Sequence, residues 1–478
     1  MDKARKLQLA TDFYQFSVSN VYAAEGFTDK IAVFDVFIRK NPFNGGYTVF
    51  SGLQQIIDYI KDLHFDEEDI AMLRENHPEM TEEFLSYLKD FRFTGDIYAM
   101  KEGEVVFPQE PLVRVKAPLI QAQLVETTIL AMVNHEALIA TKASRVCDAA
   151  KGDVVLDFGL RRAHGTEAGL YGARAAIIGG CAGTSNSEAE YRFGTISKGT
   201  MSHAFVMSFE DEYKAFAAFA KYNPMNITVL VDTYDTLKSG VPNAIKLFDE
   251  LKKQGPIQGI YGIRLDSGDL AYLSKQAREM LDAAGHTDAI ISGSSDLDEY
   301  LISDLKAQGA KITMWGVGTK MMTAYDCPAL GGVYKLSQLD GAPKMKISDA
   351  PEKITNPGCK KVMRLYSKDT NKALADLIML EDETVDCDKP LHIFHPLFPY
   401  KQRVLTNFYA EELLVCVFKD GALCYDNPAV EESRAFHQAE KARFWHENLR
   451  FVNPNEYHVD LSDRLYDIKK DLIHKHKM

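Results

Sequence analysis

Cysteine is scarce in this 478-residue sequence, and the cysteines that occur stand alone. There are 7 of them, an odd number, scattered singly along the chain. This pattern fits neither a disulfide framework nor the paired spacing of zinc ligands. We therefore expect a protein of a reducing compartment, the cytoplasm.

Long apolar runs are also missing. No stretch approaches the roughly 18 consecutive apolar residues that a membrane-spanning helix needs, and the most apolar one, residues 168–182, is interrupted by glycines and by Arg174. The first residues, from Met1 to Lys6, do not lead into the apolar core of about 7–15 residues that marks a secretory signal. The sequence thus predicts neither export nor a membrane partner.

An excess of basic charge is absent as well. Lys and Arg total 55 against 68 for Asp and Glu, a formal net charge of −13, and the basic residues are interspersed with acidic ones. Such a chain repels a nucleic-acid backbone, so we expect no nucleic-acid partner. The hydrophobic fraction of 46% and the lack of repeats exclude disorder and a fibrous fold. At about 100–200 residues per domain, the length predicts two or three domains.

The first part of the chain mixes helical and strand patterns. An apolar run at 31–39 predicts a strand, and Ser51 stands where the N-cap of a helix over 53–63 is expected. Further helical patterns lie at 67–75, 81–90 and 121–150, and short β-rich runs interrupted by proline lie at 96–117. We interpret residues 1–135 as an N-terminal α/β domain.

The middle of the chain alternates short apolar strands with helical segments. The predicted strands are 154–157, 227–232, 260–264, 289–292 and 312–315. Alternation of this kind indicates parallel βαβ units, in an open sheet or a barrel. We assign 136–365 to this domain and 366–478 to a C-terminal mixed region whose pattern indicates no role.

Each predicted strand of the middle domain ends in a polar or glycine-rich cluster. The clusters are 157–162, 232–236, 264–269, 292–296 and 316–319. Ligands bind at the carboxyl ends of parallel strands in both barrels and open sheets. Arginines and Gly-Thr turns suit phosphate, and the carboxylates suit Mg²⁺. The alternative for each aspartate is a plain N-cap of the following helix.

His203 follows a Gly-Thr turn at 199–200 and precedes an apolar segment. A histidine in such a place is more often structural than reactive. Histidine is nevertheless one of the few side chains that can act as a nucleophile toward a phosphoryl group. A cradle for an incoming phosphate could be formed by the turn just before it.

Several motifs together resemble one known family. They are Thr11-Asp12-Phe13-Tyr14-Gln15, the segment 157–163, Gly183-Thr-Ser-Asn186, Gly199-Thr-Met-Ser-His203, Arg264-Leu-Asp-Ser-Gly-Asp269, Gly316-Val-Gly-Thr319, and Lys346-Ile-Ser348 with Pro357-Gly-Cys-Lys360. In this order and spacing the chain closely resembles the nicotinate phosphoribosyltransferases over essentially its whole length. Ala204 stands where the family commonly has serine.

The resemblance implies a type II phosphoribosyltransferase fold, an irregular α/β barrel with a second α/β domain. It also implies ATP-dependent synthesis of nicotinate mononucleotide from nicotinate and phosphoribosyl pyrophosphate, a step of NAD salvage. The implied partners are nicotinate, phosphoribosyl pyrophosphate, ATP with Mg²⁺, and a second copy of the chain in a homodimer with shared active sites.

Site residues carry over from the family position by position. His203 matches the histidine that ATP phosphorylates transiently. Tyr14, Thr200 and Arg264 match contacts to nicotinate, with Tyr14 offered across the dimer interface. Arg161 matches a contact to phosphoribosyl pyrophosphate, Gly318 and Thr319 match contacts to the phosphoribose, and Asp266 falls near the ribose and the metal. Apart from the resemblance, Asp269 is a second candidate metal ligand, because it is a carboxylate of the same strand-end cluster.

The sequence is also compatible with three other functions. A nicotinamide or quinolinate phosphoribosyltransferase would perform the same chemistry on another pyridine. A sugar-phosphate aldolase or isomerase on an ordinary barrel would also place Asp, Arg and Gly-Thr clusters at its strand ends. A protein that only binds a phosphosugar would use the same residues without turnover.

Overall fold

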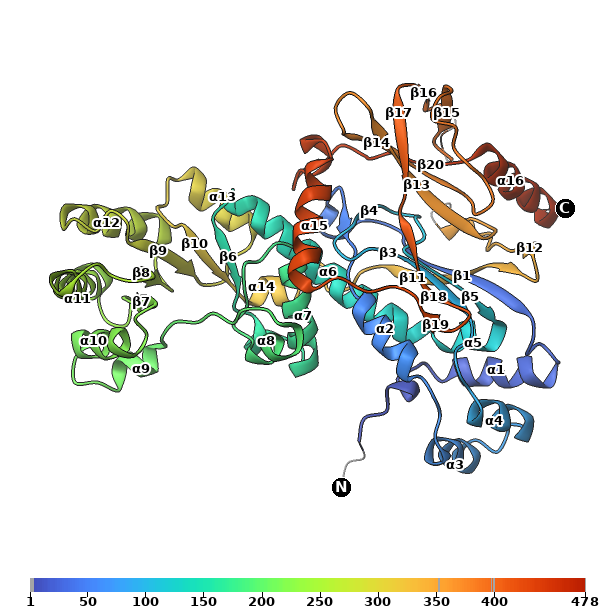
Figure 1. Ribbon diagram of the computed structural model, residues 1–478, viewed down its shortest axis with the longest axis horizontal. Helices are drawn as coiled ribbons and strands as arrows, with labels where there is room; N and C mark the ends of the chain where they lie inside the picture. The colour runs from blue at the N-terminus through green and yellow to red at the C-terminus, as the bar shows by residue number, and fades with distance from the viewer. Residues whose placement is uncertain (1–3, 351–352, 397, 399, 478) are drawn as a thin grey trace. The chain divides into compact units, whose positions relative to one another are not determined.

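The computed structural model describes residues 4–350, 353–396, 398 and 400–477 (Figure 1). The chain divides into two compact units. A central unit comprises residues 139–328, and a terminal unit joins residues 1–138 to residues 329–478. The chain passes from the terminal to the central unit within helix α6 (Glu126–Ala150). The terminal unit therefore brings together the two ends of the sequence.

The central unit is built on a parallel sheet. Its strands lie in the order β6-β10-β9-β8-β7, with bounds β6 (Val154–Asp157), β7 (Asn226–Leu230), β8 (Ile260–Leu265), β9 (Ile290–Ser294) and β10 (Met314–Val317). The helices are α7 (Thr166–Ile178), α8 (Ser187–Phe193), α9 (His203–Met207), α10 (Glu212–Tyr222), α11 (Val241–Gln254), α12 (Leu270–Ala283), α13 (Glu299–Ala307) and α14 (Thr319–Met322).

The five strands predicted for the middle of the chain are confirmed, each within two residues at either end. Because helices pack beside a parallel sheet, its strands are buried and read as continuous apolar runs, which is why the sequence revealed them. Figure 1 shows α10 to α13 beside β7 to β10. Isolated parallel bridges from Asp157 to Thr184 and from Thr184 to Ser197 extend the pairing beyond β6.

The terminal unit contains a seven-stranded sheet in the order β12-β11-β1-β5-β3-β18-β19 and a four-stranded sheet in the order β17-β13-β14-β20. The strands of the first sheet are β1 (Ile31–Ile38), β3 (Asp96–Met100), β5 (Val113–Pro118), β11 (Gly332–Leu339), β12 (Ala342–Pro343), β18 (Leu414–Lys419) and β19 (Ala422–Leu423). Those of the second are β13 (Lys360–Ser367), β14 (Ala373–Leu380), β17 (Phe408–Glu412) and β20 (Val459–Leu461). Two short pairs are β2 (Thr48–Val49) with β4 (Val105–Val106) and β15 (Leu391–Phe394) with β16 (Gln402–Leu405).

Helices of the terminal unit come mostly from the first 150 residues. They are α1 (Tyr14–Ala24), α2 (Leu53–Asp62), α3 (Glu67–Asn76), α4 (Glu82–Lys89), α5 (Leu119–Leu124) and, near the C-terminus, α15 (Val430–Ala442) and α16 (Asp463–Lys477). The helix expected over 121–150 is two helices, α5 and α6, separated at Val125.

The predicted N-cap of α2 is wrong. The N-cap residue is Gly52, at φ 109°, and the Ser51 hydroxyl donates to Glu136 at 3.2 Å instead. The Glu102 carboxylate accepts hydrogen bonds from the backbone N–H groups of Gly52 (2.9 Å) and Leu53 (3.0 Å). A residue far away in the sequence thus caps the helix, which no local pattern could indicate.

Ion pairs between distant segments neutralise two basic residues of β13, Lys360 and Arg364. The Lys360 ammonium lies 2.8 Å from a carboxylate oxygen of Asp35 on β1. The fully buried Arg364 guanidinium pairs with Asp376 at 2.7 Å and also with Glu104. These contacts allow two basic side chains to be buried within the strand β13.

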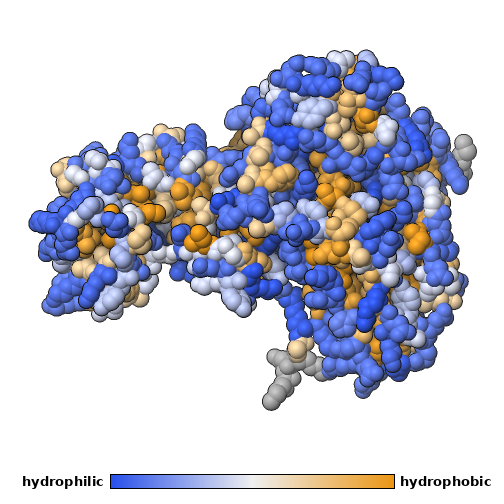
Figure 2. Space-filling model, in the orientation of Figure 1, coloured by the Kyte–Doolittle hydropathy of each residue, from blue (hydrophilic) through white to orange (hydrophobic). Residues whose placement is uncertain are grey.

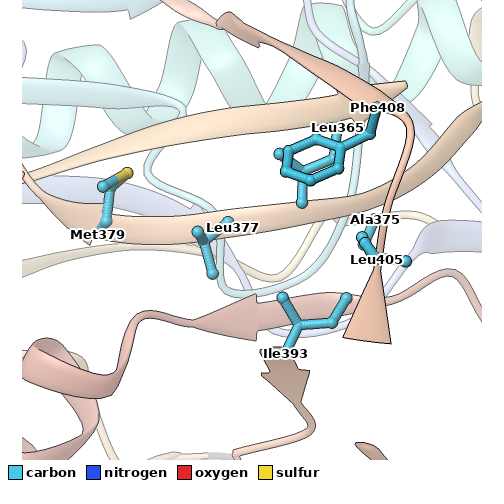
Figure 3. Close-up of a cluster of buried hydrophobic side chains, with 7 residues drawn as sticks. All are labelled: Leu365, Ala375, Leu377, Met379, Ile393, Leu405 and Phe408. Carbon is cyan, nitrogen blue, oxygen red and sulfur yellow. The ribbon is translucent and has the colours of Figure 1, made fainter. Parts of the chain in front are cut away.

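Alternation along β14 separates two environments. Leu377 and Met379 join a buried apolar cluster with Leu365, Ala375, Ile393, Leu405 and Phe408 (Figure 3). Successive side chains of a strand point to opposite faces, so Ile378 points away from this cluster. Hydrophilic residues cover most of the face seen in Figure 2, with apolar residues scattered among them. Within the described residues, no helix has the length and apolarity required to cross a membrane.

Candidate functional site

Side chains at the carboxyl ends of β6, β8, β9 and β10 line a cavity of about 210 Å³ in the central unit. Its walls are formed by Phe158, Arg161, Arg162, Arg264, Asp266, Ser294, Ser295, Asp296, Gly316, Gly318 and Thr319. Four of the five polar clusters predicted from strand ends therefore meet at one edge of the sheet. Parallel strands bring this about, because all their carboxyl ends lie on the same side.

Arg264, near the end of β8, donates hydrogen bonds to three side chains at this edge. Its Nη1 donates to Thr200 Oγ1 at 3.0 Å, and its Nε donates to Ser294 Oγ at 2.9 Å. Its Nη2 donates to Asp266 Oδ1 at 2.9 Å. The guanidinium lies 5.7 Å from the centroid of the Phe158 ring. Only 12% of the side chain is exposed, so the arginine is fixed in orientation while some of its N–H groups remain for a ligand.

Asp266 and Asp232 both face the His203 imidazole. The distance from His203 Nε2 to Asp266 Oδ2 is 3.6 Å and to Asp232 Oδ1 is 4.0 Å. The other ring nitrogen, Nδ1, lies 3.2 Å from Thr233 Oγ1. The His203 side chain is 41% exposed, so the imidazole is accessible to a ligand rather than buried as a structural histidine.

Charge and burial act in opposite directions on Asp266. Burial favours its neutral form, but a hydrogen bond from Ser294 and the adjacent Arg264 guanidinium favour the carboxylate. The net effect holds the pKa of Asp266 below its usual value. Asp266 is therefore a carboxylate at neutral pH. The Asp232 carboxylate is 2% exposed; its Oδ2 accepts from the Asp266 N–H at 3.1 Å and from Ser267 Oγ at 2.5 Å.

Asp157, the last residue of β6, connects two loops through hydrogen bonds to its carboxylate. Its carboxylate accepts hydrogen bonds from Thr184 Oγ1 at 2.7 Å and from the Gly159 N–H at 2.8 Å. Burial raises the pKa of Asp157 to about 6 despite these two hydrogen bonds. The Gly159 contact fixes the turn that carries Arg161 and Arg162 toward the cavity.

Phe158 occupies space that a glycine leaves open. A Cβ atom on Gly316 would lie 2.5 Å and 2.6 Å from two carbons of the Phe158 ring, closer than any normal contact. Ser295, which also lines the cavity, has φ 107°, a conformation rarely adopted by residues other than glycine and often found at functional sites.

Most residues predicted for the site meet here. Arg161, Arg264, Asp266, Gly318 and Thr319 line the cavity. Thr200 contacts Arg264, and His203 faces Asp266.

Two predicted residues, Tyr14 and Asp269, are not among those that line this cavity. Asp269 caps α12, accepting from the Tyr272 N–H at 2.9 Å, which is the alternative weighed for such aspartates. Tyr14 begins α1 in the terminal unit, where its side chain is 47% exposed. Partial burial and the nearby Glu126 carboxylate raise the pKa of Tyr14 to about 12.

The residue-by-residue prediction omitted Phe158, Ser294, Asp232 and Thr233. All four lie in clusters that the sequence marked by their position after a strand. The local sequence did not distinguish these four residues from others in the same clusters, because their roles depend on contacts with Arg264 and His203 that form only in the folded protein. Within the described part of the chain, no group of three or more His, Cys, Asp or Glu side chains is arranged to hold a metal ion.

Comparisons with known proteins agree with this architecture. Family models match the nicotinate phosphoribosyltransferase N-terminal domain at residues 9–134, the nicotinate phosphoribosyltransferase family at 154–377 and its C-terminal domain at 359–469. A nicotinate phosphoribosyltransferase of Bacillus subtilis is 47% identical over 99% of this chain and 97% of its own length. One of Dictyostelium discoideum is 36% identical over 97% of this chain and 88% of its own length.

Solved structures show the same fold. The crystal structure of human nicotinic acid phosphoribosyltransferase superposes with a TM-score of 0.85 at 28% identity, covering 97% of this chain and all of that one. A nicotinate-nucleotide pyrophosphorylase of Pyrococcus furiosus shares the fold at a TM-score of 0.70 and 21% identity, with coverage of 93% and 98%. The predicted type II phosphoribosyltransferase fold is thereby confirmed. From the matched family models and the full-length relatives we conclude that the chain belongs to the nicotinate phosphoribosyltransferase family.

Proposed function

We propose that this protein transfers the phosphoribosyl group of phosphoribosyl pyrophosphate to nicotinate, a glycosyl transfer that serves NAD biosynthesis, and couples the transfer to ATP through a phosphohistidine at position 203. The observation that carries the proposal is the convergence of Arg264, Asp266 and an accessible His203 beside a cavity rich in arginine. In the reaction, the nicotinate ring nitrogen forms a bond to C1 of the ribose as the bond from C1 to pyrophosphate breaks.

The contacts of Arg264 support nicotinate as the acceptor. Its guanidinium is held by Thr200, Ser294 and Asp266 and retains N–H groups for a carboxylate. The Phe158 ring beside it offers a face for the pyridine. Nicotinamide lacks the negative charge, so the same site disfavours it.

Arg161 and Arg162 support a pyrophosphate-bearing donor. Both line the cavity on the turn held by Asp157. Displacement at the anomeric carbon passes through a state with positive charge on the ribose and negative charge on the departing pyrophosphate. Fixed guanidinium groups stabilise the leaving group, and the Asp266 carboxylate stabilises the ribose.

The surroundings of His203 indicate which of its nitrogens would be phosphorylated. Two carboxylates face Nε2, and they favour the tautomer whose proton is on that nitrogen. The lone pair is then on Nδ1, where it accepts a hydrogen bond from the Thr233 hydroxyl; we assign Nδ1 as the nucleophile once an incoming phosphate displaces this contact. Its attack forms a bond to the terminal phosphorus of ATP as the bond to ADP breaks, and water later cleaves the P–N bond to release phosphate. This step would make the enzyme a phosphoprotein of the ligase class.

The residues beside His203 fit a Mg²⁺ ion shared with substrate. Asp232 Oδ1 is buried and lacks a hydrogen-bond partner, and the Asp266 carboxylate lies on the same side of the imidazole. Mg²⁺ is usually held by one or two protein carboxylates together with phosphate oxygens and water. Asp266 and Asp232 would hold the ion, which would neutralise charge on the bound phosphates. Asp269 is the weaker candidate because it caps α12.

One assay tests the proposed reaction. The full-length protein is incubated with Mg²⁺, phosphoribosyl pyrophosphate and nicotinate, with and without ATP, and nicotinate mononucleotide and pyrophosphate are quantified. We expect product from nicotinate, none from nicotinamide or quinolinate, and stimulation by ATP. Product from another pyridine alone would contradict the acceptor, and binding without turnover would contradict catalysis.

The phosphohistidine has its own test. ATP labelled on the γ-phosphate should give acid-labile label on the wild-type protein and none on His203→Ala. The Asp232→Asn variant keeps the shape of the side chain but removes one charge facing Nε2, and it should label more slowly. Label on another residue, or ATP-stimulated turnover that persists in His203→Ala, would contradict the coupling.

We also propose that the active enzyme is a homodimer in which Tyr14 of one copy completes the site of the other. The exposure of Tyr14, which leaves its side chain accessible to a second copy, supports this. Tyr14→Ala and His203→Ala are expected to be inactive alone. Refolded or co-expressed mixtures should regain activity, because a mixed dimer contains one intact site. No recovery in a proven mixed dimer would contradict shared sites.

A further inference from the structure

A second, larger cavity lies in the terminal unit. Its volume is about 550 Å³, within the range of about 300–1,000 Å³ typical of sites for small molecules. Every residue that lines it belongs to the terminal unit, whereas the site around His203 belongs to the central unit. Nothing in the proposed phosphoribosyl transfer uses its residues.

One wall of this cavity is apolar and rigid. Its accessible apolar surface includes the partly exposed Ile354 and Val459, whereas Ile378 of β14, which also lines it, is fully buried. Phe107 and Tyr457 lie beside it as a stacked pair, with ring centroids 4.0 Å apart at 20°. The Tyr457 hydroxyl donates to Asp376 at 2.9 Å, which in turn holds the buried Arg364. The aromatic surface is thus anchored to the interior of the unit.

The same cavity carries uncompensated positive charge. Lys469 on α16 donates to the neutral Asn356 amide oxygen at 2.7 Å, and among the described residues neither it nor Arg39 or Lys40 forms an ion pair. The Arg39 Nε is buried without a hydrogen-bond partner. Glu456, also on the cavity wall, lies 3.6 Å from the Lys401 ammonium.

An unsatisfied buried donor such as the Arg39 Nε calls for an explanation in a folded protein. Burial and the nearby Lys360 lower the pKa of Lys469 to about 8, as expected when an ammonium lacks a counter-ion. An anion in the cavity would satisfy Arg39 Nε and Lys469 together. Because several cations share one cavity, a dianion is favoured over a monoanion.

We propose that this cavity is a separate binding site for a small organic phosphate monoester, whose phosphate contacts Lys469 and Arg39 and whose flat apolar body packs against the partly exposed Ile354 and Val459. The apolar wall distinguishes such a ligand from inorganic phosphate, which would leave that wall exposed. The cations distinguish it from a neutral aromatic molecule.

Calorimetric titration of the full-length protein with phenyl phosphate tests the proposal. Phenyl phosphate should bind more tightly than inorganic phosphate or benzoate, and phenol should not bind measurably. Lys469→Met keeps the apolar stem of the side chain and removes its charge, and it should weaken phenyl phosphate binding about 10- to 100-fold. Lys470→Met is the matched control, because Lys470 is the next residue of α16 and pairs with Asp467 on the surface; its affinity should equal that of the wild type.

Further variants separate this cavity from the site around His203. Lys40→Met changes an exposed residue of the same wall and should also weaken binding, which keeps the test valid should Lys469→Met fold poorly. His203→Ala should leave phenyl phosphate binding unchanged, and Lys469→Met should leave nicotinate turnover unchanged. The proposal would be overturned if the wild type did not bind phenyl phosphate, or if Lys469→Met and Lys40→Met both bound it with the affinity of the wild type. Loss of turnover in Lys469→Met would assign the cavity to the reaction itself and would also overturn it.

Discussion

The contact between Gly316 and Phe158 makes a sharp test of how the cavity is built. The missing side chain of Gly316 leaves room for the Phe158 ring, whose nearest carbon would lie 2.5 Å from an added Cβ. Ordinary contact begins near 3.4 Å, so in Gly316→Ala the ring must retreat by about 0.9 Å, the difference between these distances. Phe158 lies beside Arg264, and its displacement moves the surface on which we place the pyridine.

Both stability and catalysis should respond to Gly316→Ala. Overpacking of this kind costs about 1–3 kcal/mol of unfolding free energy. A displacement of about 1 Å at a reacting group can lower the rate about 100-fold, so we expect kcat/KM for nicotinate to fall about 10- to 100-fold. Urea denaturation measures the first effect, and initial rates of pyrophosphate release measure the second.

A double-mutant cycle decides whether the ring is the cause. In the Phe158→Ala background the added methyl group meets no ring, so Gly316→Ala should cost little further stability, and the two changes should be strongly non-additive. Gly331→Ala is the control, because a Cβ there has no heavy atom within 4 Å. Additive effects, or a Gly316→Ala enzyme with wild-type kcat/KM, would refute the reasoning.

Three further predictions concern charge. Arg264→Lys keeps the positive charge but cannot hold three partners in one plane, so kcat/KM for nicotinate should fall about 100-fold while the melting temperature changes little, as steady-state kinetics and calorimetry can check. Burial lowers the pKa of His437 to about 3, so this group contributes stability that is present above about pH 6.5 and is lost on acidification. The change in unfolding free energy from pH 5 to pH 6 should therefore be less positive in His437→Gln than in the wild type, by up to about 1.4 kcal/mol. Burial raises the pKa of Glu104 to about 7 in spite of Arg364, so the stability that this group contributes is present at about pH 4.5 and is lost as the pH rises to about 7. In Glu104→Gln the change in unfolding free energy from pH 5 to pH 6 should be more positive than in the wild type by a similar amount. Urea denaturation at pH 5 and pH 6 checks both variants. The two assignments would be contradicted if the unfolding free energy changed by the same amount between these pH values in the wild type and both variants.

Local patterns predicted the elements of the central unit well. The strands at 154–157 and 260–264 are apolar runs because helices pack beside the sheet, and each is followed at once by polar residues. The helix at 53–63 was visible in its amphipathic spacing, but its cap was not, because Glu102 supplies the cap from outside the helix.

The terminal unit shows where such patterns fail. Strand β1 pairs with β11, so that Ala32 lies opposite Leu339. Lys360 is buried because Asp35, from the other end of the chain, neutralises it. A basic residue read alone indicates an exposed position, and only the fold provides the partner that allows its burial.

What the sequence by itself determined is the alternation of strands and helices, the polar clusters that follow the strands, and the motifs that indicate the family; each depends on neighbours within a few residues. The tertiary structure alone decided which members of those clusters touch. Arg264 contacts Thr200 and Ser294, and His203 faces Asp232 and Asp266, because parallel strands bring separate loops to one edge of the sheet. Hydrogen bonds and ion pairs depend on distances in space, and no spacing along the chain records those distances.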